Sequence, residues 1–318
     1  MNDLSQGKLA ETRRSRTLCY GSISSHPSGG DECSTFTGPF IEISTIDKII
    51  ALSIGFLLYI SIQIYPQMPE LPDLAVMAKN LQKRLEGKTV QSLELHVTKK
   101  TVATEKEFFE ALVSHKVKSV TREGKELRIA IGENRLGLHL MLHGELKLVE
   151  GDPPKFPIFH LNFGKESLYL TDFQNQARPI LNPEESGVPD ALAISAREFS
   201  GLLGKKKGDI KAVLLDQKSI RGIGNAYADE ILYDAGISPH SLASKVPADQ
   251  LFESMARVLK GAIDHISKAD PDRVTGENRD FMKVHLPKIK ETAKGEVIIV
   301  DKKGSRKSYY VENQKEYK

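Results

Sequence analysis

The sequence predicts an α+β protein in which an N-terminal helix and an antiparallel β-sandwich precede a helical domain and a C-terminal β-hairpin. Three observations lead to this fold class. A helical apolar period follows residue 70, short apolar runs of strand length occupy residues 90–170, and longer helical periods return after residue 195. The 318 residues are enough for two domains with separate cores.

Residues 1–67 differ in character from the rest of the chain. Residues 1–46 are rich in Ser, Thr and Gly and have no sustained apolar period, which predicts a disordered extension. Residues 49–64 form an uncharged, mostly apolar run of 16 residues, which is shorter than the roughly 20 residues of a bilayer-spanning helix. Three interpretations follow: a membrane anchor, a cleaved targeting segment, or translated upstream sequence before a start at Met68. We favour the third.

The first folded region is expected at residues 68–182. Leu74, Met77, Leu81 and Leu85 recur at helical spacing, and Gly87 is placed to end that helix. A capping-box pattern at Thr104 predicts one inserted helix. Helix, strands and one inserted helix suggest a sandwich with the N-terminal helix packed against it. Strands are expected at residues 90–97, 117–121, 127–131, 136–142, 158–163 and 167–170.

A loop at residues 182–190 is the expected hinge to the second region, because it contains Pro183, Gly187 and Pro189. A helical domain at residues 191–280 and a terminal hairpin unit at 281–318 follow. Helices are expected at residues 195–203, 210–215, 225–235 and 248–268, and a strand–turn–strand pattern at 295–310.

The segment around Gly222, Gly224 and Asn225 has a physical interpretation of its own. Glycines allow a tight turn and a close backbone approach. Asn225 then opens a helix, whose N-terminus offers unpaired N–H groups and partial positive charge. The segment therefore predicts an anion site, although an ordinary helix–turn–helix connection would have the same pattern.

Charge and cysteine content narrow the choice of partners and metals. The first 67 residues hold five of the 45 basic and six of the 42 acidic side chains, which leaves 40 basic and 36 acidic. A nucleic-acid binder with so small an excess must gather its positive charge on one face. Both cysteines, Cys19 and Cys33, precede Met68, so the rest of the chain has no thiolate zinc ligand.

Met68-Pro69-Glu70 carries the most specific chemistry in the sequence. Once the methionine is removed, Pro69 becomes a free secondary amine that can attack an aldehyde-like sugar carbon and form an iminium ion. Glu70 lies beside it for general acid–base work. Within a continuous chain the nitrogen of Pro69 is an amide and has no nucleophilicity.

Two further segments resemble the formamidopyrimidine-DNA glycosylase and endonuclease VIII family. One is the glycine-rich segment 214–232. The other is Arg122-x-Gly124-Lys125, whose lysine lies 56 positions after Pro69. The resemblance runs from Met68 to near the C-terminus. It implies a helix–two-turn–helix motif in the helical domain and a finger at the C-terminal hairpin.

The resemblance implies a bifunctional DNA glycosylase and apurinic/apyrimidinic lyase of base-excision repair. Such an enzyme excises oxidised bases of the formamidopyrimidine or 8-oxoguanine type and cleaves the strand by β,δ-elimination through a proline iminium. Pro69, Glu70 and Lys125 are the expected catalytic residues. The residues expected to bind DNA are Asn225, Arg306, Lys218, Leu142 and His139.

Among these, Lys125 and Leu142 also have simpler interpretations. A lysine at a turn is usually a solvated charge. Leu142, where the family commonly has methionine, is either a wedge that fills the space of the extruded base or a core residue on a strand.

The sequence departs from the family in two places. The family usually has an arginine and a phenylalanine in the loop around Asp172. Here the loop is Asp172-Phe173-Gln174-Asn175-Gln176-Ala177, which leaves the opposite-base preference open. Four cysteines are also missing from the terminal hairpin, so we expect a zinc-less finger without metal. The side chains expected to hold it by packing are Val297, Ile298, Ile299, Val300, Tyr309 and Tyr310.

The expected partner is damaged double-stranded DNA, with no diffusible cofactor and no obligate protein partner. We expect a monomer in the cytoplasm and nucleoid, or in the nucleus, with membrane association only if residues 49–64 are an anchor. One alternative function stays open. A chain that retains the extension would bind damaged DNA without catalysing any reaction.

Overall fold

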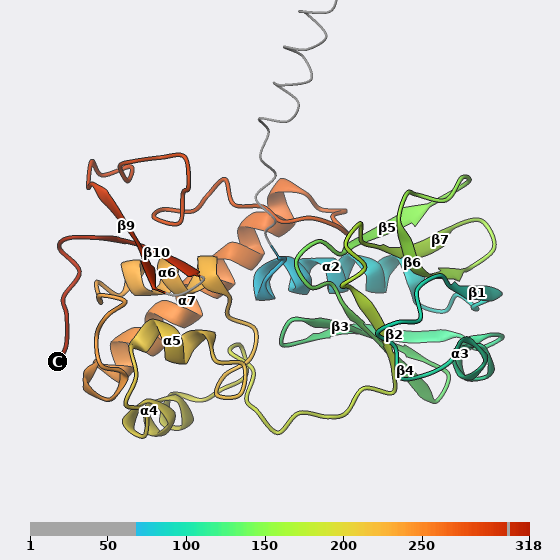
Figure 1. Cartoon of the computed structure of the whole chain (residues 1–318), viewed down its shortest axis with the longest axis horizontal. Coiled ribbons are helices and arrows are strands. Elements are labelled where there is room, and N and C mark those ends of the chain that lie inside the picture. Colours follow the sequence, from blue (N-terminus) through green and yellow to red (C-terminus); the bar gives the residue numbers. More distant parts are fainter. Residues whose placement is uncertain (1–67, 304–305) are drawn as a thin grey trace, which may run out of the picture. The chain divides into compact units, whose positions relative to one another are not determined.

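A computed structural model describes residues 68–303 and 306–318 of the chain (Figure 1). The predictions for residues 1–67, including the apolar run 49–64, lie outside the described residues. Among the residues that the structure does describe, none of the helices is both long enough and apolar enough to cross a bilayer. The predicted α+β fold is confirmed for this part of the chain.

Helix α2 (Leu71–Leu85) opens the described chain and belongs to two hydrophobic cores. Its first turn is closed by the backbone N–H of Glu70, which donates to Asp73 Oδ2 over 3.1 Å. Leu71 is buried in the core of the helical half, whereas Leu74 and the later apolar residues of α2 are buried in the sandwich core. The helix therefore connects the two halves through its own side chains.

Two four-stranded antiparallel sheets form the sandwich, in the orders β2-β3-β4-β8 and β1-β6-β7-β5. Leucine, isoleucine and phenylalanine side chains of both sheets share one core. Helix α3 (Glu105–Leu112) lies between β1 and β2 in the chain, and Thr104 caps it by accepting the Glu107 backbone N–H. The strands are β1 (Ser92–Leu95), β2 (Val117–Glu123), β3 (Glu126–Ile131), β4 (Asn134–His139), β5 (Glu145–Val149), β6 (Pro157–Asn162), β7 (Ser167–Thr171) and β8 (Arg178–Leu181).

One expected strand ends early, and two of the observed strands were not expected. The strand expected at 136–142 ends at His139, because Met141 adopts a positive φ of 56° and turns the chain. Strands β5 and β8 were not expected. Pro179 within β8 removes a ladder donor, and β8 tolerates it because this strand lies at the edge of its sheet.

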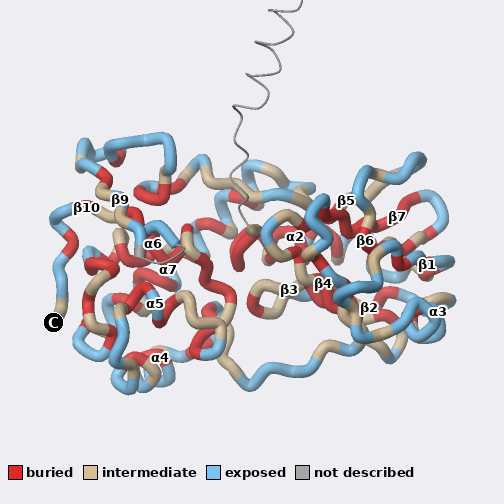
Figure 2. Tube along the Cα trace, viewed as in Figure 1, coloured by how far each residue is buried: buried red, intermediate tan, exposed pale blue. Residues whose placement is uncertain are grey.

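The helical half is organised around the long helix α7 (Ala248–Ala269), which contacts α2, α4 and α6. One face of α7 is apolar and buried and the opposite face is exposed, so its trace in Figure 2 includes both red and pale blue segments. Residues 182–190, largely without regular structure, connect the sandwich to this half. The other helices are α4 (Ala196–Gly204), α5 (Ile210–Leu215), α6 (Asn225–Asp234) and the 3₁₀ turn η1 (Ala243–Lys245).

The terminal hairpin consists of β9 (Ile298–Lys303) and β10 (Arg306–Val311). A small core beneath it contains Ile298, Tyr309, Val311 and Val284. The packing expectation was therefore wrong in part, because Val297 and Val300 are 64% and 49% exposed. The run of four apolar residues gave no alternation from which the inward-facing side chains could be recognised.

Candidate active site and nucleic-acid interface

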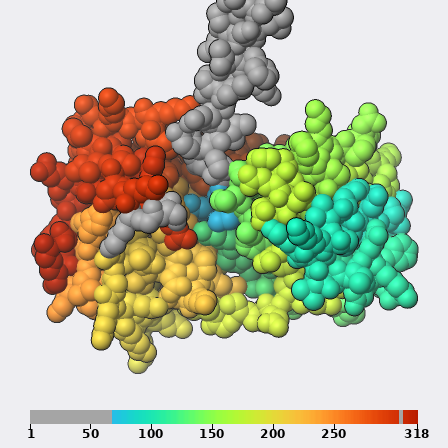
Figure 3. Space-filling view, in the orientation of Figure 1, coloured from blue at the N-terminus to red at the C-terminus, as the bar shows by residue number. Residues whose placement is uncertain are grey.

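A cavity of about 670 Å³ lies where the two halves meet. In the space-filling view, blue atoms near the start of the described chain are visible in the depression between the helical half and the green sandwich (Figure 3). The side chains that line the cavity come from widely separated parts of the sequence. They include Glu70, Lys125, His139, Leu142, Asn225, Arg279, His285 and Arg306.

Glu70 forms the buried floor of this cavity at the N-terminus of α6. Its carboxylate accepts the backbone N–H groups of Gly224 (2.8 Å to Oε2), Ala226 (3.0 Å to Oε1) and Tyr227 (3.3 Å to Oε2). A helix N-terminus stabilises a negative charge through these unpaired donors. The predicted anion site at this helix terminus is thus occupied by the chain's own carboxylate.

The two glycines before α6 are needed for its approach to α2. A Cβ on Gly224 would lie 2.2 Å from the carboxyl carbon of Glu70, and one on Gly222 would lie 2.5 Å from Leu71 Cδ1. Gly222 also has a φ of 103°, which L side chains rarely adopt. The glycine pattern therefore brings α6 close enough to fix Glu70.

Pro69 lies beside this floor and is buried, while its neighbours Met68 and Glu70 both line the cavity. In the 318-residue chain the Pro69 nitrogen is bonded to the Met68 carbonyl carbon. The predicted nucleophile and its acid–base partner are therefore placed together, with Met68 next to them in the cavity.

Lys125 is delivered by the two-residue turn between β2 and β3. The turn is tied to the connecting segment by Asp190, which accepts two 2.7 Å bonds from Arg122 and a 3.0 Å bond from the Gly124 N–H. Burial lowers the pKa of Lys125, the charge of Glu70 opposes this, and Arg306 lowers the pKa further. Lys125 is therefore a half-buried amine held near Glu70 rather than a solvated surface charge.

Arg306, Asn225 and Lys218 differ in how they relate to the cavity. Arg306 begins β10, is exposed and lines the cavity. Asn225 also lines it, and its Nδ2 donates to the carbonyl oxygen of Lys307 over 3.0 Å. Lys218 is exposed but is not among the residues that line the cavity. The site thus contains two of these three residues.

His139 and Leu142 form part of the cavity rim after β4. Leu142 is 52% exposed, so it is not a core residue on a strand. The Met141 backbone N–H donates to His139 Nδ1 over 3.2 Å, which stabilises the turn that projects Leu142. The pKa of His139 is lowered, first by burial and then by the charges of Arg178 and Lys125.

Comparison with known proteins decides the family. Residues 68–178 match the formamidopyrimidine-DNA glycosylase N-terminal domain, and residues 187–270 match the formamidopyrimidine-DNA glycosylase H2TH domain. The chain belongs to the formamidopyrimidine-DNA glycosylase family. Membership makes it a DNA glycosylase of base-excision repair with a helix–two-turn–helix domain, as the resemblance implied.

Individual members of the family agree with this assignment. The formamidopyrimidine-DNA glycosylase of Carboxydothermus hydrogenoformans is 32% identical, with 70% of this chain and 88% of the relative covered. That of Pelotomaculum thermopropionicum is 31% identical over 76% and 97%. The complex of Lactococcus lactis Fpg with abasic-site DNA has a TM-score of 0.68 at 22% identity over 76% of this chain and 98% of that chain. The solved structure supports the fold.

A charged network behind the glycosylase family's Pro-Glu segment was missed by the sequence analysis. Arg279 pairs with Asp73 and with Glu277, each over 2.9 Å, and its guanidinium lies 5.0 Å from the centre of the Tyr227 ring. Burial raises the pKa of Asp73, and burial raises the pKa of Glu277 to about 7. Asp73 and Arg279 are 206 positions apart, so no local pattern could have linked them.

A second buried network attaches the family's finger to its helical domain. Lys211 pairs with Asp229 over 2.6 Å, and Asp229 also contacts His285 Nδ1 over 2.8 Å. Lys211 Nζ donates to the Lys307 carbonyl oxygen over 2.8 Å and to Ser308 Oγ over 3.0 Å. The hairpin that presents Arg306 is therefore fixed by polar contacts as well as by its small core.

Proposed function

We propose that this chain excises oxidised bases of the formamidopyrimidine or 8-oxoguanine type and then cleaves the DNA strand as an apurinic/apyrimidinic lyase. The curated relatives named above are formamidopyrimidine-DNA glycosylases, and the Lactococcus lactis protein has been solved with an abasic site. The damaged nucleotide must leave the duplex, because its sugar carbon is not accessible inside the stack. A cavity of about 670 Å³ is within the size range of small-molecule sites.

In this mechanism Pro69, as an N-terminal amine, attacks C1′ and displaces the base. The proton that the amine loses passes to the departing base, and the carboxyl group of Glu70, in its protonated form, donates the proton that the sugar ring oxygen takes up as the ring opens. The iminium that forms acidifies the 2′ hydrogens, so β-elimination expels the 3′ phosphate and δ-elimination expels the 5′ phosphate. Lys125, Asn225 and Arg306 hold the lesion or its flanking phosphates and keep C1′ near the amine.

One observation carries the proposal: the carboxylate of Glu70 is fixed by three backbone N–H groups directly after the buried Pro69. A catalytic acid contributes most when its geometry is set before the substrate binds. Lys125 and Arg306, which line the same cavity, add positive charge where a phosphate backbone would approach.

A second candidate function applies to a chain that retains the residues before Pro69. Its Pro69 nitrogen is an amide, and Met68 lies in the cavity. Such a chain keeps Lys125, Arg306 and Leu142 but lacks the nucleophile. It would bind damaged duplex DNA without cleaving it.

Borohydride trapping on an abasic duplex distinguishes the two functions, because reduction converts the iminium to a stable covalent complex. A chain that begins at Pro69 should be trapped, and the 318-residue chain should not. Pro69→Gly keeps a primary amine and should retain weak trapping, whereas Glu70→Gln should impair base release. Trapping of the intact 318-residue chain would mean that a lysine is the nucleophile, with Lys125 the first to test.

A further inference from the structure

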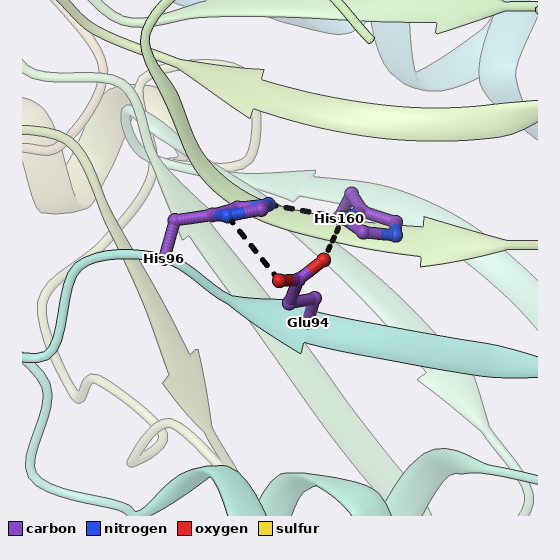
Figure 4. Close-up of side chains that lie close together, drawn as sticks. All are labelled: Glu94, His96 and His160. Atoms are coloured by element: carbon purple, nitrogen blue, oxygen red, sulfur yellow. Dashed lines mark hydrogen bonds and ion pairs between the residues drawn. The ribbon is translucent and has the colours of Figure 1, made fainter.

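A cluster of two histidines and one glutamate lies on the sandwich, outside the DNA-facing cavity. Glu94 belongs to β1, His96 follows the end of that strand, and His160 belongs to β6. Figure 4 shows the three side chains converging from these neighbouring strands. None of them lines the cavity described above, so the proposed DNA chemistry gives them no role.

The sheet register creates this cluster. Glu94 and His160 are direct partners in the antiparallel β1–β6 pairing. His96 lies two residues after Glu94 and shares its face of the sheet, because strand side chains alternate. The His96 backbone N–H donates to the Ile158 carbonyl oxygen over 2.9 Å, which keeps the chain on the strand path. The backbone therefore holds all three side chains on one face.

The two imidazole nitrogens are spaced as in a tetrahedral metal site, and the glutamate carboxylate lies next to them. His96 Nε2 and His160 Nδ1 are 3.2 Å apart. Two imidazole nitrogens bound to one tetrahedral Zn²⁺, with Zn–N bonds of about 2.0–2.1 Å, would be about 3.3 Å apart. Glu94 Oε2 lies 4.0 Å from His160 Nδ1, and Oε1 lies 3.8 Å from His96 Nδ1. One donor atom from each of the three side chains lies within 4.8 Å of the other two.

His160 is held in place by its neighbours. Its ring stacks on Tyr169 of β7, with centroids 4.7 Å apart and an interplanar angle of 28°. Tyr169 is its cross-strand partner and is buried. A ligand whose ring is fixed in this way loses little conformational freedom when it binds an ion, which favours binding.

We propose that Glu94, His96 and His160 bind a divalent transition-metal ion of the Zn²⁺ class, with water completing the coordination. Two imidazoles and one carboxylate suit Zn²⁺, whereas Mg²⁺ and Ca²⁺ prefer oxygen donors alone. Within residues 68–303 and 306–318, this is the one group of three or more His, Cys, Asp or Glu side chains close enough to share an ion. The proposed metal site lies in the sandwich. It is separate from the terminal hairpin, for which the sequence predicts no metal.

The test uses the full 318-residue chain carrying Cys19→Ser and Cys33→Ser, because thiolates elsewhere in the sequence would compete for Zn²⁺. The metal-free protein is titrated with Zn²⁺ by calorimetry, and Co²⁺ absorption reports four-coordinate geometry. Glu94→Gln and His96→Ala change exposed residues, so they should fold normally. His160→Gln tests the ring that packs on Tyr169. His115→Ala is the matched control, because His115 is an exposed histidine of the same domain.

We expect one equivalent of Zn²⁺ to bind, with affinity at least about tenfold weaker in Glu94→Gln, His96→Ala and His160→Gln and unchanged in His115→Ala. Far-ultraviolet circular dichroism of each metal-free variant checks that it is folded. Two results would overturn the proposal. One is the absence of saturable Zn²⁺ binding, and the other is one-equivalent binding that survives both Glu94→Gln and His96→Ala.

Discussion

The floor of the cavity between the two halves holds its charged group inside the protein, whereas the rim presents side chains to solvent. Glu70 is 5% exposed and accepts three backbone N–H groups, while Leu142 at the rim is 52% exposed and Arg306 is exposed. Lys125 is intermediate, half-buried on an anchored turn. The floor is therefore fixed by backbone hydrogen bonds of the protein itself, whereas Leu142 and Arg306 at the rim extend into solvent.

Gly224→Ala should displace the Glu70 carboxylate at the cavity floor and have the largest effect on base excision. The added Cβ would meet the Glu70 carboxylate at 2.2–2.5 Å, so the carboxylate must move. A displacement of about 1 Å can cost about 100-fold in rate, and overpacking should lower the free energy of unfolding by about 1–3 kcal/mol. Single-turnover base excision and thermal unfolding of a chain beginning at Pro69 measure both.

Gly261→Ala in α7 is the matched control for this substitution. Its Cβ would meet no atom within 4 Å, and alanine in a helix interior should stabilise the protein by about 0.5–1 kcal/mol. Excision by Gly224→Ala within about twofold of the unsubstituted chain would mean that the position of Glu70 does not limit the reaction.

Asp190→Ala should loosen the turn that lies between floor and rim. The ion pair with Arg122 is largely buried, at 9% and 13% side-chain exposure, and removing one partner of such a pair costs about 3 kcal/mol. We expect a lower melting temperature and slower excision, because Lys125 loses its anchor. Glu133→Gln is the control. It breaks an exposed ion pair with Lys118, which lies on β2 like Arg122, and should leave the melting temperature nearly unchanged.

The same ion pair predicts a pH dependence. The Arg122 hydrogen bonds and charge outweigh burial and hold the pKa of Asp190 below its usual range. Its stabilising contribution should be complete above the unfolded pKa of about 4 and should disappear as the pH falls through the lower folded value. Unfolding curves of Asp190→Ala and the unsubstituted chain should therefore converge at acid pH. A constant difference down to strongly acid pH would contradict this linkage.

Arg306→Ala should have a smaller effect, on the salt dependence of DNA affinity, and it tests whether the rim contacts phosphate. If Arg306 contacts phosphate, the slope of log affinity against log salt should decrease by about one charge, for damaged and undamaged duplexes alike. Lys106→Ala, at an exposed residue of α3, is the control and should leave the slope unchanged. An unaltered slope in Arg306→Ala would remove Arg306 from the DNA contacts.

Treatment with a metal chelator should have the smallest effect on the terminal hairpin that carries Arg306. The hairpin is held by Ile298, Tyr309 and Val311 and by the contacts of Lys211, and among its described residues there is no cysteine. We expect DNA affinity to stay within about twofold after treatment with a chelator. Loss of DNA binding that zinc restores would show that the finger needs a metal.

The sequence was sufficient for features whose signals are local. Helical periodicity predicted α2, and the capping box at Thr104 predicted α3. The run at Val297 and Val300 misled because both faces of the strand are apolar in sequence. The cluster of Glu94 and His160 could not be found, because it depends on a strand register that joins distant segments.

The candidate site was predictable to a similar extent. The cavity contains Glu70, Lys125 and Arg306, which the family pattern indicated, but it does not include Lys218. Lys218 lies close to the glycine-rich turn in the sequence, but its side chain does not line the cavity. The contact of Glu70 with α6 was also missed, because Glu70 and Gly224 are 154 positions apart in the sequence.

Because α2 contributes Leu71 to one core and Leu74 to the other, the two halves share a single structural element. Opening either core exposes apolar surface on the same helix, so neither half can loosen without weakening the other. The amides in the middle of α2 should then exchange with solvent only in the rarest, most extensive openings of the chain. The helix that follows the proposed nucleophile is thereby expected to be among the slowest-exchanging segments of the protein.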